Sequence, residues 1–401
     1  MRYLALLIQV NAAFITFVSG TFHFICTDPS VLEQHKIALG NDGDQNLAES
    51  YRYLLTQANK AASITEILTV VDKEELPPSG NPHDYLSLAR YYWPDATKPD
   101  GLPYIRQDGH VNEEIRDAPD YTRLRNMIKY VRDLGFAYYF SGNQTLATKA
   151  IDILQTWYID TNKKMDPNLN FASLVKGQST GRRTGLIDMS VIGDMLDVIP
   201  ILETTPEWNP LIQEGLTTWF EEYLSWLHST PFRDEEQGSL NNHGTFFDYQ
   251  YLSITQFLGK MDLVMQTVQN VATRRIAAQI TSEGVQTHEV SRPNSWYYSI
   301  FNLSGLFRLA STASLLGVDL WNYQSPEGGS IRLATDYLIP FALGEKSWPY
   351  PDISDTGSTE LFAQLLKFAA SAYNEPRYSE FSQEIMNISK PRKDYNLLLI
   401  R

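Results

Sequence analysis

Residues 124–157 read LRNMIKYVRDLGFAYYFSGNQTLATKAIDILQTW, and they carry the clearest structural pattern of the chain. Apolar residues recur there at steps of three and four on both sides of the turn Ser141-Gly142-Asn143. The first stripe comprises Leu124, Ile128, Val131, Leu134 and Tyr138, and the second comprises Ala147, Ala150, Ile151, Leu154 and Trp157. This period is that of an amphipathic helix, so the stretch predicts two helices joined as an αα-hairpin.

The same pattern recurs along the chain. Similar helix pairs break at residues 258–262, 316–319 and 373–376, each at a short turn with Gly or Asn. A recurring hairpin needs neighbours to bury its apolar faces, which is typical of an open solenoid or of a closed α/α toroid. Residues 296–316 are apolar on nearly all sides, as an inner-ring helix would be, and this favours the toroid. The prediction is therefore an all-α toroid that forms a single domain over residues 21–401.

The N-terminal residues are typical of a secretory signal peptide over residues 1–20. Arg2 is followed by an uncharged stretch from Tyr3 to Val18 and then by small residues. No later run approaches membrane-spanning length, so we expect a secreted or periplasmic protein without a membrane anchor. Cys26 follows residues that are too large for a lipoprotein cleavage site, and as the single cysteine it cannot form an internal disulfide.

The charge of the chain restricts its partners. A formal net charge of −14 disfavours nucleic acid, because the overall field repels a polyanion. An anionic polysaccharide can still bind where cations are gathered locally. One such place is the segment 174–188, which contains Lys176, Gln178, Arg182 and Arg183 among several glycines. It lacks the Gly-Lys-Ser/Thr ending of a phosphate-binding loop, so carboxylate binding is the better interpretation, with a solvated surface turn as the alternative.

Two motifs carry the chemistry. Residues 241–244 read Asn-Asn-His-Gly, and residues 292–298 read Arg-Pro-Asn-Ser-Trp-Tyr-Tyr. Asn242 and Arg292 could neutralise a sugar carboxylate, so that negative charge developing on it is stabilised. His243 and Tyr298 could supply the proton transfers. Taken singly, each residue is more often structural than functional, and the combination is what indicates an active site. No metal or other cofactor is predicted, because the seven histidines show no His-x-x-x-His pairing.

These motifs resemble the alginate lyases and related uronate-polymer lyases, most of all the single-domain members of polysaccharide lyase family thirty-eight. In that family an Asn-His pair precedes an Arg and a Tyr on a later helix. The resemblance implies an α/α toroid, a cleft lined or lidded by the irregular segment 75–120, and a substrate-binding role for Tyr85. In some alginate lyases the catalytic Tyr follows the Arg by seven residues, but residue 299 is Ser here. The context Tyr-Ser-x-x-Asn favours Tyr298, and Tyr297 stays open.

The resemblance implies β-elimination on a 1,4-linked uronate polymer, most of all mannuronate-rich alginate, with glucuronan as the alternative. In both sugars the C5 proton and the C4 oxygen lie on the same side of the ring, so Tyr298 could take the proton and pass it on. A nearby guanidinium is expected to lower the pKa of this phenol, while His243 could act as base on guluronate. The rivals are a glycoside hydrolase on the same toroid, which needs two flanking carboxylates, and a non-catalytic glycan-binding protein.

Overall fold

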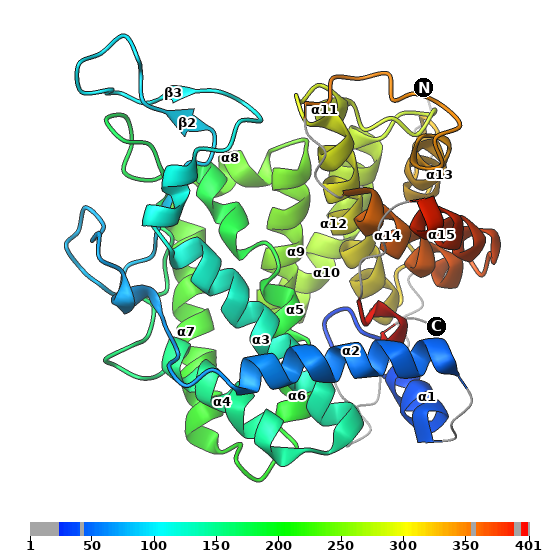
Figure 1. The fold of residues 1–401 in the computed structure, drawn as a ribbon, viewed down its shortest axis with the longest axis horizontal. Coiled ribbons are helices and arrows are strands. Elements are labelled where there is room, and N and C mark those ends of the chain that lie inside the picture. The colour runs from blue at the N-terminus through cyan, green and yellow to red at the C-terminus, as the bar shows by residue number, and fades with distance from the viewer. Residues whose placement is uncertain (1–23, 41–43, 354–357, 389–393, 400–401) are drawn as a thin grey trace.

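The computed structural model describes residues 24–40, 44–353, 358–388 and 394–399, and the expected signal peptide lies outside these ranges. Helical hairpins follow one another around a ring, as Figure 1 shows. The α-helices are α1 (Pro29–Gly40), α2 (Gln45–Ala62), α3 (Asp120–Ser141), α4 (Gln144–Tyr158), α5 (Ile192–Leu196), α6 (Ile199–Leu202), α7 (Pro210–Ser229), α8 (Arg233–Gln237), α9 (Asn242–Phe257), α10 (Met261–Val271), α11 (Thr287–Val290), α12 (Ser295–Leu315), α13 (Ile331–Ala342), α14 (Ser358–Ala372) and α15 (Arg377–Ile388). The predicted all-α toroid is confirmed.

The hairpin of α3 and α4 forms where the sequence predicts it. Gly142 ends α3 in the left-handed conformation, with φ of 69°, which a glycine adopts without strain. The side chain of Asn143 then caps α4 by accepting a hydrogen bond from the backbone N–H of Thr145 at 3.1 Å. Of the two predicted stripes only Tyr138 is not fully buried.

The inner wall of the ring is formed by α3, α5, α9, α12 and α14, which contact one another in that order. On α9, 13 of 16 residues are buried, and on α12, 14 of 21 are buried. Helices covered on nearly all sides in this way belong to an interior layer. The other member of each hairpin, such as α4, α10 and α15, packs on the outside.

The ring is joined where the first and last described segments meet. Both α1 and α2 contact the short helix η5 (Asn396–Leu398) (Figure 1). The backbone N–H groups of Ile25, Cys26 and Thr27 all donate to one carboxylate oxygen of Asp197, which is 2% exposed. The Cys26 thiol lies 3.5 Å from the other oxygen of that carboxylate. No helix of the described ranges is long and apolar enough to cross a membrane.

The irregular segment 75–120 contains the short strands β1 (Leu86–Leu88), β2 (Tyr92–Trp93) and β3 (Ile105–Arg106) and the short helix η2 (Glu113–Asp117). Strand β1 pairs in parallel with β4 (Phe171–Leu174), and β2 pairs with β3 in an antiparallel ribbon that extends from the body of the ring (Figure 1). After β4, the short helix η3 (Arg183–Met189) returns the chain to the ring. These pairings hold two irregular stretches side by side next to the N-terminal ends of α9 and α12.

Candidate active site

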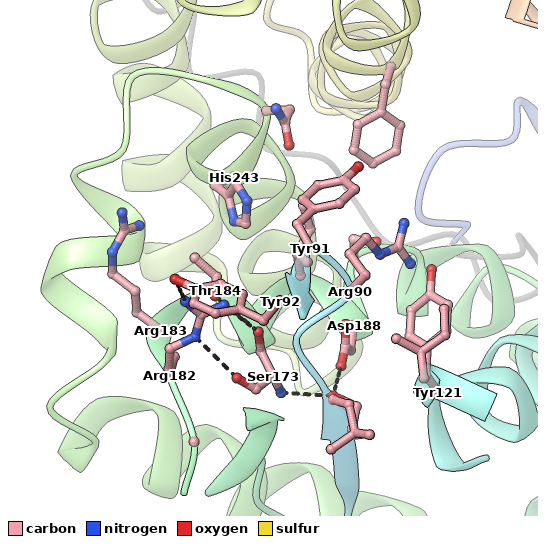
Figure 2. Close-up of a pocket in the computed structure, with 18 of the residues that line it drawn as sticks. Arg90, Tyr91, Tyr92, Tyr121, Ser173, Arg182, Arg183, Thr184, Asp188 and His243 are labelled. Atoms are coloured by element: carbon pink, nitrogen blue, oxygen red, sulfur yellow. Dashed lines mark hydrogen bonds between the residues drawn. The ribbon is translucent and has the colours of Figure 1, made fainter. Parts of the chain in front are cut away.

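A cleft of about 860 Å³ opens where the N-terminal ends of α9 and α12 meet the segments 75–120 and 173–190 (Figure 2). Of the carboxylates that the structure describes, only Asp188 and Glu235 line it. Its seven arginines are Arg90, Arg106, Arg116, Arg125, Arg182, Arg183 and Arg292. Among the described residues, Arg90, Arg125 and Arg182 have no carboxylate partner within ion-pair distance. In a protein with a net charge of −14, this local excess of cations suits an anionic ligand.

Asn242 and His243 occupy the first turn of α9, whose N-cap is Asn241. The Asn241 side chain accepts from the backbone N–H of His243 at 3.1 Å, and Glu289 accepts from the backbone N–H of Asn242 at 2.5 Å. These bonds satisfy N–H groups that a helix leaves unpaired at its start. The Asn242 amide also donates to both oxygens of Glu289, at 3.0 and 2.9 Å. In this conformation the donor that was expected to face a sugar carboxylate is therefore occupied by Glu289.

The glycine of the Asn-Asn-His-Gly motif has a packing reason. A Cβ atom on Gly244 would collide with the backbone oxygen of Ser239 and with the guanidinium of Arg275. Arg275 is 1% exposed and donates to the backbone oxygens of Gln237 and Ser239 at 2.7 and 2.8 Å. It thereby fixes the loop between α8 and α9 next to the first turn of α9.

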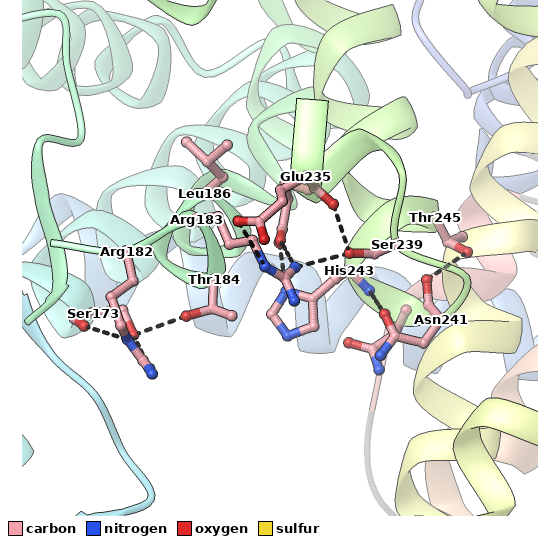
Figure 3. A network of polar contacts seen from close by, with 12 residues as sticks. Ser173, Arg182, Arg183, Thr184, Leu186, Glu235, Ser239, Asn241, His243 and Thr245 are labelled. Carbon is pink, nitrogen blue, oxygen red and sulfur yellow. Dashed lines mark hydrogen bonds and ion pairs between the residues drawn. The ribbon is translucent and has the colours of Figure 1, made fainter. Parts of the chain in front are cut away.

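His243 is held by a carboxylate from that same region. Its Nδ1 lies 2.5 Å from Oε1 of Glu236, which is 1% exposed. A carboxylate only accepts hydrogen bonds, so in the neutral imidazole this contact places the proton on Nδ1 and leaves Nε2 as an acceptor. The other oxygen of Glu236 accepts from Arg183 at 2.7 Å. Arg183 also donates to Ser239 at 2.9 Å (Figure 3). Arg183, Glu236 and His243 thus form one connected network.

Arg292 and Tyr298 meet at the start of α12. The guanidinium of Arg292 lies 3.9 Å from the centre of the Tyr298 ring, and two of its nitrogens donate to Asp108 at 3.0 and 2.8 Å. Burial alone would raise the pKa of Asp108, but the hydrogen bonds from Arg292 hold it below its usual range. The hydroxyl of Tyr298 lies 2.6 Å from that of Tyr91. Segment 75–120 thus supplies a partner to both residues, as expected for a segment that lines the cleft.

The pKa of Tyr298 differs from the expectation. Burial and the neighbouring Tyr91 raise it above the ordinary value, and the opposing effect of Arg292 is smaller. Arg292 does lower the pKa of this phenol, as predicted, but burial and Tyr91 outweigh its effect, so the net pKa is raised in the free protein. Tyr298 rests as a protonated phenol, which is a proton donor.

The structure separates the other predicted binding residues. Arg182 and Arg183 line the cleft, and Arg182 is fixed there by Ser173 and by Tyr92, whose ring lies 4.5 Å away (Figure 2). Tyr85 is fully buried and donates to Asp188 at 2.9 Å, so it supports the cleft from beneath and its predicted contact with substrate is wrong.

Lys176 and Gln178 also fall outside the cleft lining. Lys176 pairs with Glu114 at 3.1 Å, and Gln178 is exposed on the turn after β4. Their assignment as substrate-binding residues therefore stays a prediction, for a part of the polymer that extends beyond this cleft. A loop can carry several polar residues of which only some face the cleft, and the sequence does not give their directions.

The resemblance placed segment 75–120 at the cleft, but the individual roles of several cleft residues were not predicted from the sequence. Tyr91, Arg90 and Arg125 line the cleft, while Glu236 and Asp108 hold His243 and Arg292. The acidic pair at 235–236 and the tyrosines at 91–92 were visible in the sequence, but nothing local distinguishes them from surface residues. In the described ranges no group of three or more His, Cys, Asp or Glu side chains is arranged to hold a metal ion.

A family model described as alginate lyase matches residues 69–348, which is more than half of the chain. The chain belongs to the alginate lyase family. This confirms the family that the Asn-His and Arg-Tyr motifs indicated, and membership supports polysaccharide lyase activity. No curated protein matches the chain.

Solved structures agree with this family. An alginate lyase from Bacteroides ovatus is 34% identical, with a TM-score of 0.88 over 94% of this chain and 99% of that chain. Alginate lyase A1-III from Sphingomonas species A1 is 18% identical, with a TM-score of 0.57 over 94% of this chain and 97% of that chain. A tyrosine-to-phenylalanine variant of A1-III complexed with a tetrasaccharide is 17% identical, with a TM-score of 0.58 over the same shares. At such identities the two A1-III structures show that the fold is shared.

Proposed function

We propose that this member of the alginate lyase family cleaves a 1,4-linked uronate polymer by β-elimination and that mannuronate-rich alginate is its preferred substrate. The observation that carries the proposal is the meeting of His243, Arg292 and Tyr298 in one arginine-lined cleft at two helix N-termini. A helix N-terminus carries a partial positive charge, so both helices favour an anion in this place. The products would be one chain with a new reducing end and one with a C4–C5 double bond.

Two proton transfers complete the reaction. The C5–H bond breaks and its electron pair forms the C4–C5 double bond, while the C4–O bond breaks and its oxygen takes up a proton. Arg292 stabilises the charge that spreads onto the C5 carboxylate during the first transfer. The substrate carboxylate must share the guanidinium of Arg292 with Asp108 or replace that residue. Asn242 assists only after its amide turns away from Glu289.

We assign the second transfer to Tyr298, because a protonated phenol can donate directly to the leaving oxygen. Its raised pKa makes Tyr298 a poor base in the first transfer, since very little phenolate is present. We assign the first transfer to His243, whose Nε2 has no hydrogen-bond partner among the described residues and whose Nδ1 is fixed by Glu236. The competing assignment is that Tyr298 itself takes the C5 proton of mannuronate. The competing substrate is glucuronan.

The contacts of the two cleft carboxylates disfavour a glycoside hydrolase. Asp188 accepts hydrogen bonds from Tyr85 and Ser87 beneath the cleft, and the largely exposed Glu235 pairs with Arg183 at 3.5 Å. Neither has the setting of the acid and base that flank a glycosidic bond.

The deciding experiment measures the ultraviolet absorbance of the unsaturated product and the reducing ends together. Block-defined mannuronate, guluronate and glucuronan polymers serve as substrates. We expect both signals to rise in proportion, fastest on mannuronate blocks. Reducing ends without absorbance would indicate a hydrolase, binding without either signal would indicate a glycan-binding protein, and a faster reaction on glucuronan would replace the proposed substrate.

A further inference from the structure

A second cavity, of about 470 Å³, lies at the seam of the ring, between α3, α12, α14 and the segment around η5. We call it the seam cavity. Arg125 lines both the seam cavity and the catalytic cleft, so the two spaces adjoin across this side chain. The proposed reaction assigns no role to the seam cavity.

Among the described residues, four cations and the three carboxylates of Asp133, Asp194 and Asp394 line the seam cavity. Arg125, Lys129 and Arg132 recur at steps of four and three on α3, so they share one face of that helix, and Arg308 approaches from α12. Lys129 is paired with Asp133, and Arg308 donates to both oxygens of Asp194 at 3.1 and 3.0 Å.

Arg125 and Arg132 are different. Within the described ranges, neither has a carboxylate oxygen within ion-pair distance. Arg125 donates to the hydroxyl of Ser190 at 3.3 Å, and the guanidinium of Arg132 lies 5.2 Å from the centre of the Tyr395 ring. A guanidinium stacked on a ring keeps its N–H groups free in the plane, where a carboxylate can accept two of them. Two unpaired guanidinium groups in one cavity are therefore ready to bind an anion.

The remaining lining suits a sugar. Phe368 offers an apolar ring against which the C–H face of a pyranose can pack, and Asn126 and Gln364 offer amide groups to sugar hydroxyls. The volume falls within the range of roughly 300–1,000 Å³ that is typical of small-molecule sites. Inorganic anions would use the arginines but not the ring or amides.

We propose that the seam cavity binds a short uronate, a sugar acid whose carboxylate contacts Arg132 and Arg125. The choice of a uronate over another sugar acid rests on the proposed function, whereas the site itself rests on the geometry of the seam cavity. Such a ligand has two sources. It is either a released oligosaccharide or the end of a polymer that continues from the cleft past Arg125.

The test uses the full chain with Tyr298→Phe, so that the probe is not consumed, and titrates a saturated mannuronate disaccharide by calorimetry. We expect two sites per chain. Arg132→Gln in this background should weaken one of them by about tenfold or more, the usual scale for losing a charge-assisted hydrogen bond. Arg132→Lys should restore part of the loss. Arg52→Gln, the same substitution on the exposed side of α2, serves as the matched control and should change nothing.

Three further arms separate the alternatives. A neutral disaccharide should not bind at the seam cavity, because it lacks the carboxylate. Ser311→Trp, which places a large ring in the cavity while both arginines remain, should remove the same site as Arg132→Gln and covers the case in which Arg132 is needed for folding. A saturated mannuronate hexasaccharide distinguishes the two sources of the ligand. Binding of two hexasaccharides per chain indicates a separate site for released product. Binding of one hexasaccharide, with an affinity that falls in Arg132→Gln, indicates that the polymer continues from the cleft into the seam cavity.

The inference would be overturned by a single disaccharide site in Tyr298→Phe. It would also be overturned by two sites whose affinities are unaffected by Arg132→Gln and Ser311→Trp. In either case Arg132 would be a residue that only packs on Tyr395. This outcome is independent of turnover. If the wild type releases unsaturated product but one site is found, the proposed function stands and this inference fails. If two sites are found without turnover, this inference stands and the proposed function fails.

Discussion

At the scale of single residues, neighbouring tyrosines offer a direct comparison. Tyr298→Phe removes the hydroxyl that is proposed to protonate the leaving oxygen, so kcat should fall by about 10²–10⁴-fold with little change in substrate binding. Tyr297 also lines the cleft, but its ring stacks on Phe301, and Tyr297→Phe should be much milder. Steady-state kinetics on mannuronate blocks measure both. A larger loss for Tyr297→Phe would move the catalytic role to that residue.

His243→Ala tests the assignment of the base. With Tyr298 protonated at rest, mannuronate and guluronate blocks both depend on His243, and kcat should fall by about 10²–10⁴-fold on each. The variant should bind hexasaccharide as Tyr298→Phe does, which the same calorimetric titration checks. If mannuronate cleavage survives while guluronate cleavage is lost, Tyr298 takes the C5 proton itself and its pKa must fall when substrate binds.

The adjacent arginines 182 and 183 were expected to serve binding alone, and their contacts now predict a difference. Arg182 is fixed by Ser173 and Tyr92 and touches no proposed catalytic residue, so Arg182→Ala should raise KM and leave kcat nearly unchanged. Arg183 donates to the carboxylate that holds His243, so Arg183→Ala should lower kcat. Glu236→Gln should lower kcat in the same way, because it disturbs the same imidazole. Equal effects of both arginines on KM alone would show that the Glu236 contact has no catalytic consequence.

At the scale of elements, the start of α9 depends on a buried carboxyl group. Burial raises the pKa of Glu289 to about 7, even though the hydrogen bonds from Asn242 favour its charged form. An unfolded glutamate has a pKa of about 4.3. The native state therefore binds the proton more tightly than the unfolded state, and the stability from this group is full below about pH 4.3 and is lost as pH rises towards 7.

Glu289→Gln removes this titration while it keeps an oxygen that can accept from Asn242. The melting temperature of the wild type should fall relative to that of the variant between pH 5 and pH 8, by on the order of 2 °C or more. Glu222→Gln, on the exposed side of α7, is the matched control, and its melting temperature should change with pH as that of the wild type does. A constant difference between wild type and Glu289→Gln across this pH range would contradict the raised pKa.

Elements were predictable from the sequence to the extent that local patterns define them. The hairpin of α3 and α4 follows from two apolar stripes and the turn at residues 141–143, and the inner-ring position of α12 follows from its apolar surface. The cleft walls were predictable only as an irregular segment. Their contacts join residues far apart in sequence, such as Arg292 with Asp108 at a separation of 184 residues and Tyr85 with Asp188 at 103. No periodicity encodes such pairs, so Tyr85 was expected to contact substrate, and the contact of Glu236 with His243 was not predicted.

At the scale of the whole molecule, the charge distribution predicts how salt acts. An acidic protein gathers cations in its cleft, so polymer binding depends on exposed charges that are screened beyond a Debye length of about 8 Å at physiological ionic strength. KM on long polymer should rise with added salt while kcat changes little. The slope of log KM against log salt should be smaller for Arg182→Ala than for the wild type. A salt effect on kcat alone would mean that screening acts on the reaction step.

The ring should also behave as a single unit. We expect residues 21–401 to form one domain, because one connected core includes side chains from α1 to α15 and from η5. Thermal unfolding followed by far-ultraviolet circular dichroism should be a single transition, and limited proteolysis should not release two stable halves. Two stable fragments, or two separate transitions, would divide the chain into domains.

The joining of the ring by its first and last segments bears on biosynthesis. His35 on α1 contacts the backbone oxygen of Leu398, 363 residues later, and the hydroxyl of Tyr395 donates to Asp133 at 2.5 Å. Until η5 and Tyr395 have been synthesised, α1 and α3 lack these partners, and contacts of such sequence separation form slowly. A nascent chain should therefore stay incompletely folded until η5 is made. For a protein that we expect to be exported, this delay would keep the chain flexible enough for transport up to that point.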